Sequence, residues 1–134
     1  MNDKNKVVLV LEDEKPLLDA IKIKLEKNGF EVVTVRSVDQ AKQYTEDLAK
    51  IDLIWLDHYL IGKETGLDFI AWCKEEKNAR CKEIPIFVVS NTASSDKVST
   101  YMSLGAEKYF IKSNHKLDEI IKEIRETLRM DSNI

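Results

Sequence analysis

Short β-branched runs alternate with longer amphipathic stretches along the chain, and this alternation limits the fold more than any other feature. The apolar runs are residues 6–11, 31–36, 51–56, 84–89 and 108–111. Strands that are separated by helices run parallel with right-handed crossovers, and near-continuous apolar runs suit strands that are covered on both faces. The pattern therefore predicts an α/β fold with a five-stranded parallel sheet and helices on both faces.

The stretches between and after these runs have the period of amphipathic helices. Ser37 and Gln40 have the S-x-x-Q spacing of a capping box, and Gly29 and Gly105 stand where helices should end. The apolar positions of the five expected helices are, in chain order, Leu17, Leu18, Ile21 and Leu25; Ala41, Tyr44 and Leu48; Leu67, Phe69, Ile70 and Trp72; Val98, Met102 and Leu104; and Leu117, Ile120, Ile121, Ile124 and Leu128.

Length and composition indicate a single globular domain. The chain has 134 residues, of which 43% are hydrophobic, and no linker rich in proline, glycine or serine divides it. We expect one domain over residues 1–134, with its core in residues 6–130. The chain ends at Ile134, shortly after the last expected helix, so an output domain has no room and the protein should act through a partner or be part of a longer chain.

Charge and cysteine content exclude several classes of protein. A net charge of −3, from 21 basic and 24 acidic residues, does not favour a nucleic-acid or membrane partner. No apolar run reaches the length of a signal-peptide core or a membrane span, so a soluble cytoplasmic protein is expected. Cys73 and Cys81 are too few for a disulfide scaffold, which predicts free thiols in a reducing compartment.

Charged and hydroxyl side chains follow the ends of four of the five runs. Glu12 and Asp13 follow the first, Asp57 the third, Ser90 the fourth and Lys112 the fifth. Five strand–helix units favour a doubly wound open sheet over an eight-fold barrel, and such sheets bind ligands beyond the carboxyl ends of their strands. The candidate site is therefore this edge of the sheet.

The residue types at this edge fit phosphoryl transfer to a carboxylate. Adjacent carboxylates repel one another unless a cation lies between them, and oxygen ligands with retained waters suit Mg²⁺. Asp57 would act as the nucleophile, Lys112 and Mg²⁺ would neutralise the phosphoryl oxygens, and the Ser90 hydroxyl would donate to another oxygen.

The segments LVLEDE, DLIWLD, VVSN and YFIK, in this order over residues 6–130, resemble the receiver domain of two-component response regulators. The resemblance implies the flavodoxin-like strand order 2-1-3-4-5. It implies these roles: Asp57 as phosphoacceptor, Glu12 and Asp13 as the acidic pair around Mg²⁺, the Tyr59 backbone carbonyl as a further metal ligand, Ser90 as the switch hydroxyl, Lys112 as the family's lysine, and Tyr109 as the switch aromatic.

The resemblance also implies the partners. A histidine kinase or a histidine phosphotransfer domain would supply the phosphoryl group, and the protein would be no enzyme beyond phosphorylating and dephosphorylating itself. The fourth helix, fifth strand and fifth helix would form the surface for a downstream protein target, and whether activation forms a homodimer stays open.

Two loops depart from the family pattern. Ser113 replaces the usual proline after Lys112, and LIGKETG, which ends at Gly66, is one residue longer than usual.

The sequence speaks against two other functions. A haloacid dehalogenase-type hydrolase would need an aspartate where Tyr59 stands, and the acidic EDEKP would repel the phosphate of a flavodoxin-like carrier. A receiver-like interaction module that is never phosphorylated is the remaining alternative. His58 and His115 lack neighbours for a transition-metal site, and neither is given a role.

Overall fold

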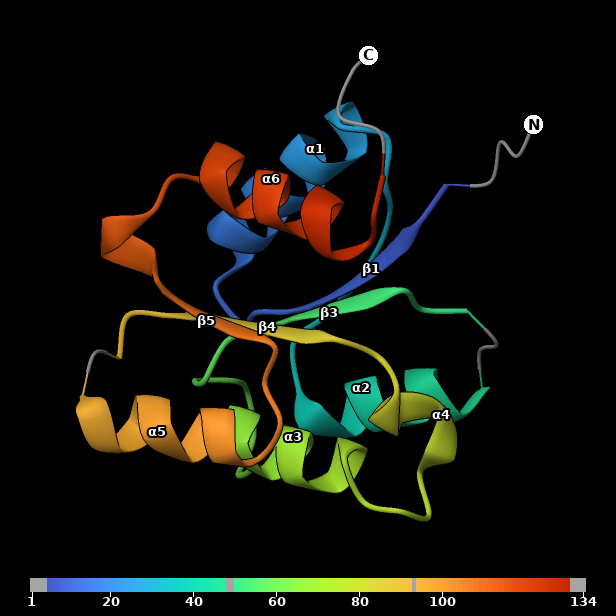
Figure 1. Ribbon diagram of the computed structural model, residues 1–134, viewed down its shortest axis with the longest axis vertical. Coiled ribbons are helices and arrows are strands. Elements are labelled where there is room, and N and C mark those ends of the chain that lie inside the picture. Colours follow the sequence, from blue (N-terminus) through green and yellow to red (C-terminus); the bar gives the residue numbers. More distant parts are fainter. Residues whose placement is uncertain (1–4, 48–49, 93, 131–134) are drawn as a thin grey trace.

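The computed structural model describes residues 5–47, 50–92 and 94–130, and within them strands alternate with helices as the sequence predicts (Figure 1). The strands are β1 (Val7–Leu11), β2 (Glu31–Val35), β3 (Leu53–Leu56), β4 (Ile86–Ser90) and β5 (Lys108–Ile111). The helices are α1 (Lys15–Lys27), α2 (Val38–Asp47), α3 (Gly66–Cys73), the short α4 (Ala79–Lys82), α5 (Ser95–Ser103) and α6 (Leu117–Thr127), with a 3-10 turn η1 (Lys112–Asn114) before α6.

The five strands form one parallel sheet in the order β2-β1-β3-β4-β5, which confirms the predicted doubly wound fold. The helices α1 and α6 cover one face, and α2, α3 and α5 cover the other (Figure 1). The register pairs Leu11 with Leu56 and Ser90 with Ile111. The carboxyl ends of the strands therefore reach the same edge of the sheet.

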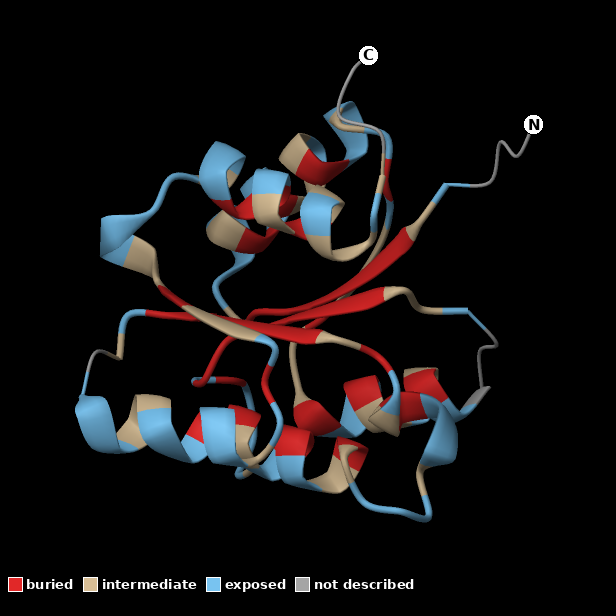
Figure 2. Ribbon diagram, viewed as in Figure 1, coloured by how far each residue is buried: buried red, intermediate tan, exposed pale blue. Residues whose placement is uncertain are grey.

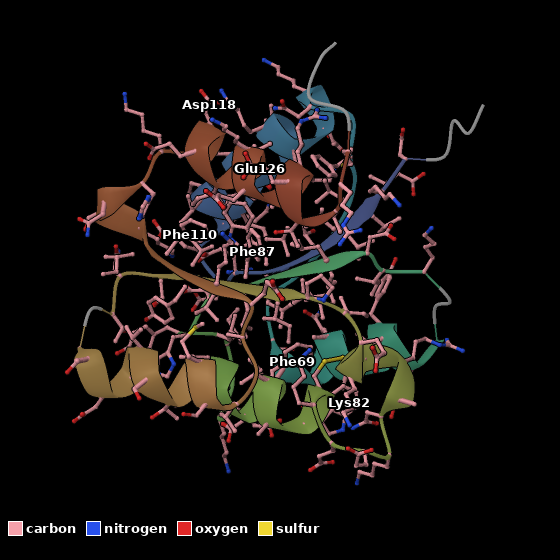
Figure 3. All side chains as sticks on the ribbon, in the orientation of Figure 1. Phe69, Lys82, Phe87, Phe110, Asp118 and Glu126 are labelled. Carbon is pink, nitrogen blue, oxygen red and sulfur yellow. A yellow bond between two sulfur atoms is a disulfide. The ribbon has the colours of Figure 1, made fainter. Side chains whose placement is uncertain are left out.

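Two apolar clusters lie on opposite faces of the sheet, and the strands β1, β3 and β4 between them are buried (Figure 2). Phe87 and Phe110 belong to the cluster under α1 and α6, whereas Phe69 belongs to the cluster under α2, α3 and α5 (Figure 3). Every residue of β1, β3 and β4 is buried, as the continuous apolar runs predict for a sheet covered on both faces. Leu48, which was expected to extend the apolar face of α2, lies outside the described residues.

The start of α2 differs in detail from the expected capping box. The Gln40 N–H donates to Ser37 Oγ at 3.2 Å, as a cap requires. The Gln40 side chain, however, accepts from the backbone N–H of Arg36 at 2.9 Å. The Gln40 side chain therefore holds the backbone of Arg36, the residue that directly follows β2.

The prediction of free thiols is wrong, because Cys73 and Cys81 form a disulfide between the end of α3 and α4 (Figure 3). The short helix α4, which no sequence period indicated, brings the two Cα atoms to 5.2 Å, within the usual range for a disulfide. A disulfide does not indicate the reducing compartment that free thiols would suggest. No helix in the described part of the chain combines the length and the apolar character that crossing a bilayer requires.

Candidate functional site

The structure places the predicted side chains together at the carboxyl edge of the sheet. Glu12 follows β1, Asp57 follows β3, and Lys112 follows β5. The parallel sheet brings these three positions to the same edge. Next to this edge the Asp57 N–H donates to the carbonyl of Leu11 at 3.0 Å. Ser90, the last residue of β4, is fully buried at the same edge.

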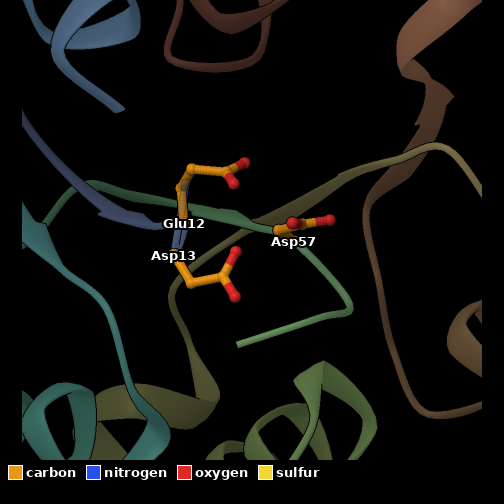
Figure 4. Close-up of side chains that lie close together, drawn as sticks. All are labelled: Glu12, Asp13 and Asp57. Carbon is orange, nitrogen blue, oxygen red and sulfur yellow. The ribbon is translucent and has the colours of Figure 1, made fainter. Parts of the chain in front are cut away.

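Three carboxylates lie close together at this edge (Figure 4). One oxygen from each of Glu12, Asp13 and Asp57 lies within 4.8 Å of the others. Glu12 is 1% exposed and Asp57 is 4% exposed, whereas Asp13 is only half-buried. Burial and the nearby charge of Asp57 raise the pKa of Glu12. Burial also raises the pKa of Asp57, although contacts with Lys112, the His58 N–H and Ser90 act against this shift.

The Lys112 ammonium joins the two buried carboxylates. Its Nζ lies 2.9 Å from Glu12 Oε1 and 3.3 Å from Asp57 Oδ2. Burial lowers the pKa of Lys112, but the hydrogen bond to Glu12 and the charge of Asp57 outweigh burial and leave this pKa raised. The other oxygen of Asp57, Oδ1, accepts the His58 backbone N–H at 2.8 Å. Both oxygens of Asp57 therefore have a donor.

The donor set fits Mg²⁺. All three candidate ligands offer carboxylate oxygens, which hard divalent cations prefer. Three carboxylates and one ammonium leave an excess of two negative charges, which one Mg²⁺ would neutralise. Tyr59, whose carbonyl is the expected fourth protein ligand, lies on the same loop as Asp57, and its phenol side chain is 60% exposed.

Ser90 and Tyr109 lie on the β4–β5 side of the site. The Ser90 Oγ accepts the Thr92 N–H at 3.3 Å, and the Tyr109 hydroxyl donates to the Thr92 carbonyl at 2.6 Å. Tyr109 is half-buried, and burial raises the pKa of its phenol. The expected switch hydroxyl and the expected switch aromatic thus contact the same residue of the β4–α5 loop.

His58 has a structural role that the sequence analysis did not give it. Its side chain is buried, and its ring lies 2.6 Å from the Tyr101 hydroxyl through Nδ1 and 3.3 Å from Lys97 Nζ through Nε2. An ammonium only donates, so Nε2 accepts and Nδ1 carries the proton that is donated to Tyr101. Burial, and then the charge of Lys97, lower the pKa of His58. The contacts of His58 with Tyr101 and Lys97 therefore link the residue after Asp57 to α5.

The two loops that depart from the family pattern have regular local structure. The longer loop after Asp57 pairs with the segment between β2 and α2 through an isolated bridge between Ser37 and Ile61, and it turns at Gly62, whose φ is +103°. Ser113, at the position of the usual proline, lies in η1. No peptide bond among residues 5–47, 50–92 and 94–130 is cis.

A model of the response regulator receiver domain matches residues 8–125. The chain belongs to the response regulator receiver domain family. This is thus a receiver domain of two-component signal transduction. The expected family and the expected fold class are both confirmed.

Relatives with known names support this placement. The receiver domain is 32% identical over 123 residues to the phosphate regulon transcriptional regulatory protein PhoB of Klebsiella pneumoniae. It is 36% identical over 122 residues to the sensory transduction protein RegX3 of Mycobacterium bovis. Each match covers 91% of this chain but only 51% and 50% of the relatives. The chain therefore spans about half the length of the curated relatives it matches.

Two solved structures have the same fold. A CheY-like receiver domain protein from Methanospirillum hungatei has a TM-score of 0.82 at 21% identity and covers 94% of this chain and 95% of its own. The phosphorylated cyanobacterial phytochrome response regulator RcpA has a TM-score of 0.80 at 28% identity, with 94% and 95% covered. The second of these solved structures is that of a phosphorylated protein.

Proposed function

We propose that this receiver domain accepts a phosphoryl group onto Asp57 from the phosphohistidine of a histidine kinase or a phosphotransfer domain, in the cytoplasm and with Mg²⁺. The observation that carries the proposal is the position of Asp57. Its carboxylate lies beside Glu12 and Asp13 and contacts Lys112 at 3.3 Å. The phosphorylated relative RcpA adds support.

The chemistry is a displacement at phosphorus. An Asp57 oxygen forms a bond to phosphorus while the phosphorus–nitrogen bond of the donor breaks, and the donor imidazole keeps the electron pair and gains a proton. Glu12, Asp13, Asp57 and the Tyr59 carbonyl would hold Mg²⁺, which when bound supplies positive charge to the phosphoryl oxygens. Lys112 then turns from Asp57 Oδ2 to a phosphoryl oxygen, and the Ser90 hydroxyl donates to another.

The acyl phosphate would act by shifting a two-state equilibrium. Ser90 would move toward the phosphoryl group, and Thr92 and Tyr109 would follow, because the Thr92 N–H donates to Ser90 Oγ and the Thr92 carbonyl accepts from the Tyr109 hydroxyl. The fourth and fifth expected helices are α5 and α6. Together with β5 they would form the surface that passes the change to a downstream protein. A shift from 1:99 to 99:1 needs a difference in affinity of about 5.5 kcal/mol between the two states.

Phosphorylation can be tested directly by incubating the protein with Mg²⁺ and phosphoramidate and measuring its intact mass. We expect one phosphoryl group in the wild type and in Asp19→Asn, a control at an exposed carboxylate on α1. Asp57→Asn should gain none, and chelating the metal should prevent the adduct in every variant. A wild type that gains no phosphoryl group under these conditions contradicts the proposal and favours the interaction module that is never phosphorylated.

Tyr59 should lengthen the lifetime of the acyl phosphate. Its ring packs edge-to-face on His58 with 4.7 Å between the ring centroids, which holds this bulky side chain two residues past the acceptor. We expect Tyr59→Asn to hydrolyse its adduct several-fold faster, because a smaller polar side chain leaves space for the attacking water. The decay of the adduct, followed by intact mass, measures this. Equal half-lives in the two proteins contradict the idea.

A further inference from the structure

Arg36, which follows β2, reaches across the edge of the sheet to the loop that carries the candidate metal ligands. Its Nε and Nη2 both donate to the backbone carbonyl of Asp13, at 3.1 and 2.6 Å. Within the described residues, no backbone N–H outside the helices and strands donates to this carbonyl. The fork of the guanidinium therefore holds the carbonyl of the Asp13–Glu14 peptide, whose N–H donates to Glu12 Oε2 at 3.1 Å.

The backbone of Arg36 contacts two further segments. Its carbonyl accepts the N–H of Ile61 at 3.0 Å, which anchors the longer loop after Asp57. Its N–H donates to Gln40 at the start of α2, which holds the residue in place. One half-buried residue thus joins the loop of Asp13 to the loop of Asp57 and Tyr59, and both loops carry candidate metal ligands.

We propose that Arg36 is a positioning residue for the metal site, which it keeps in binding geometry by holding the Asp13 peptide against the loop that follows Asp57. The inference rests on the proposed Mg²⁺-dependent function. Groups that orient metal ligands from outside the coordination sphere typically change metal affinity when they are removed. Arg36 acts in this way through a main-chain carbonyl and not by touching the metal.

The charge of Arg36 makes the proposal easy to separate from an electrostatic effect. A positive charge near a cation site repels the cation, so its removal should tighten Mg²⁺ binding on Coulombic grounds alone. Loss of positioning should weaken Mg²⁺ binding. The two explanations therefore predict changes of opposite sign in the dissociation constant.

The test is calorimetric titration of the full chain with Mg²⁺, beside thermal unfolding in a chelator. We expect Arg36→Met to raise the Mg²⁺ dissociation constant about tenfold. Arg36→Lys keeps the charge but loses the fork, and it should raise the constant by a smaller factor. The matched control is Lys15→Met, which removes an exposed positive charge at the start of α1 that is paired with Asp19. Its dissociation constant should stay the same or fall.

The outcomes distinguish the two proposals. If the wild type binds Mg²⁺ and both Arg36 variants bind it as tightly or more tightly, the positioning role is overturned while the proposed function stands. A lowered melting temperature with an unchanged dissociation constant has the same meaning, because it shows a purely structural role. If the wild type itself binds no Mg²⁺, both proposals are overturned. Should Arg36→Met not fold, the result for Arg36→Lys decides.

Discussion

Replacing Gly66 with alanine is expected to lower the free energy of unfolding by about 3 kcal/mol, at the upper end of overpacking effects. A Cβ on Gly66 would lie 2.5 Å from the Tyr101 hydroxyl and 2.6 Å from the backbone carbonyl of Asp57. Neither neighbour can give way easily. Tyr101 is fully buried and bonded to His58, and the carbonyl belongs to Asp57, the proposed acceptor.

The matched control is Gly29→Ala, measured beside Gly66→Ala by urea unfolding. Gly29 has a φ of +91° and nothing within 4 Å of its added Cβ, so this change costs only backbone strain, about 1 kcal/mol. In a Tyr101→Phe protein, Gly66→Ala should cost less stability than it costs in the wild type, because the Tyr101 hydroxyl, one of the two close atoms, is gone. A Gly66→Ala protein no less stable than Gly29→Ala contradicts the close packing of Gly66 against Asp57 and Tyr101.

Much of the fold could be predicted because it depends on periodicity and chain order. The run 108–111 is β5 to the residue, and the other strands lie within one or two residues of their predicted bounds. The convergence of Asp57, Ser90 and Lys112 could also be predicted, since parallel strands bring their carboxyl ends to one edge. Sequence position alone therefore locates a site of this kind.

The features that the sequence analysis missed depend on contacts between elements. The Cys73–Cys81 disulfide needs a four-residue helix that is too short to show a period. The bond between His58 and Tyr101 joins positions 43 residues apart. His58 follows Ile54 and Leu56 at alternate positions, and both of these residues belong to the apolar cluster under α2, α3 and α5. This alternation is the one signal that could have marked His58 as buried. For Arg36 no comparable signal exists, because its contact is with a main-chain atom.

Replacing Lys112 with methionine should have the other large effect. The change leaves Glu12 and Asp57 close together without the ammonium that lies between them, at 2.9 and 3.3 Å. Removing one partner of a buried ion pair is strongly destabilising, and with the Lys112 side chain 18% exposed we expect a loss of about 2 kcal/mol in the presence of a chelator. Phosphorylation of Asp57 should become about 100-fold slower, as when one transition-state donor is removed.

Mg²⁺ should reverse much of the loss of stability in Lys112→Met, because a divalent cation can take over the neutralisation of the two carboxylates. It should not restore the rate of phosphorylation, since the ammonium donor is still missing. The control is Lys108→Met, which removes a partly exposed ion pair between β5 and Glu123 of α6 and should change both quantities little. Unfolding measured with and without Mg²⁺, together with adduct formation, tests this. A Lys112→Met protein that Mg²⁺ stabilises no more than it stabilises the wild type contradicts a shared role of ammonium and metal at this site.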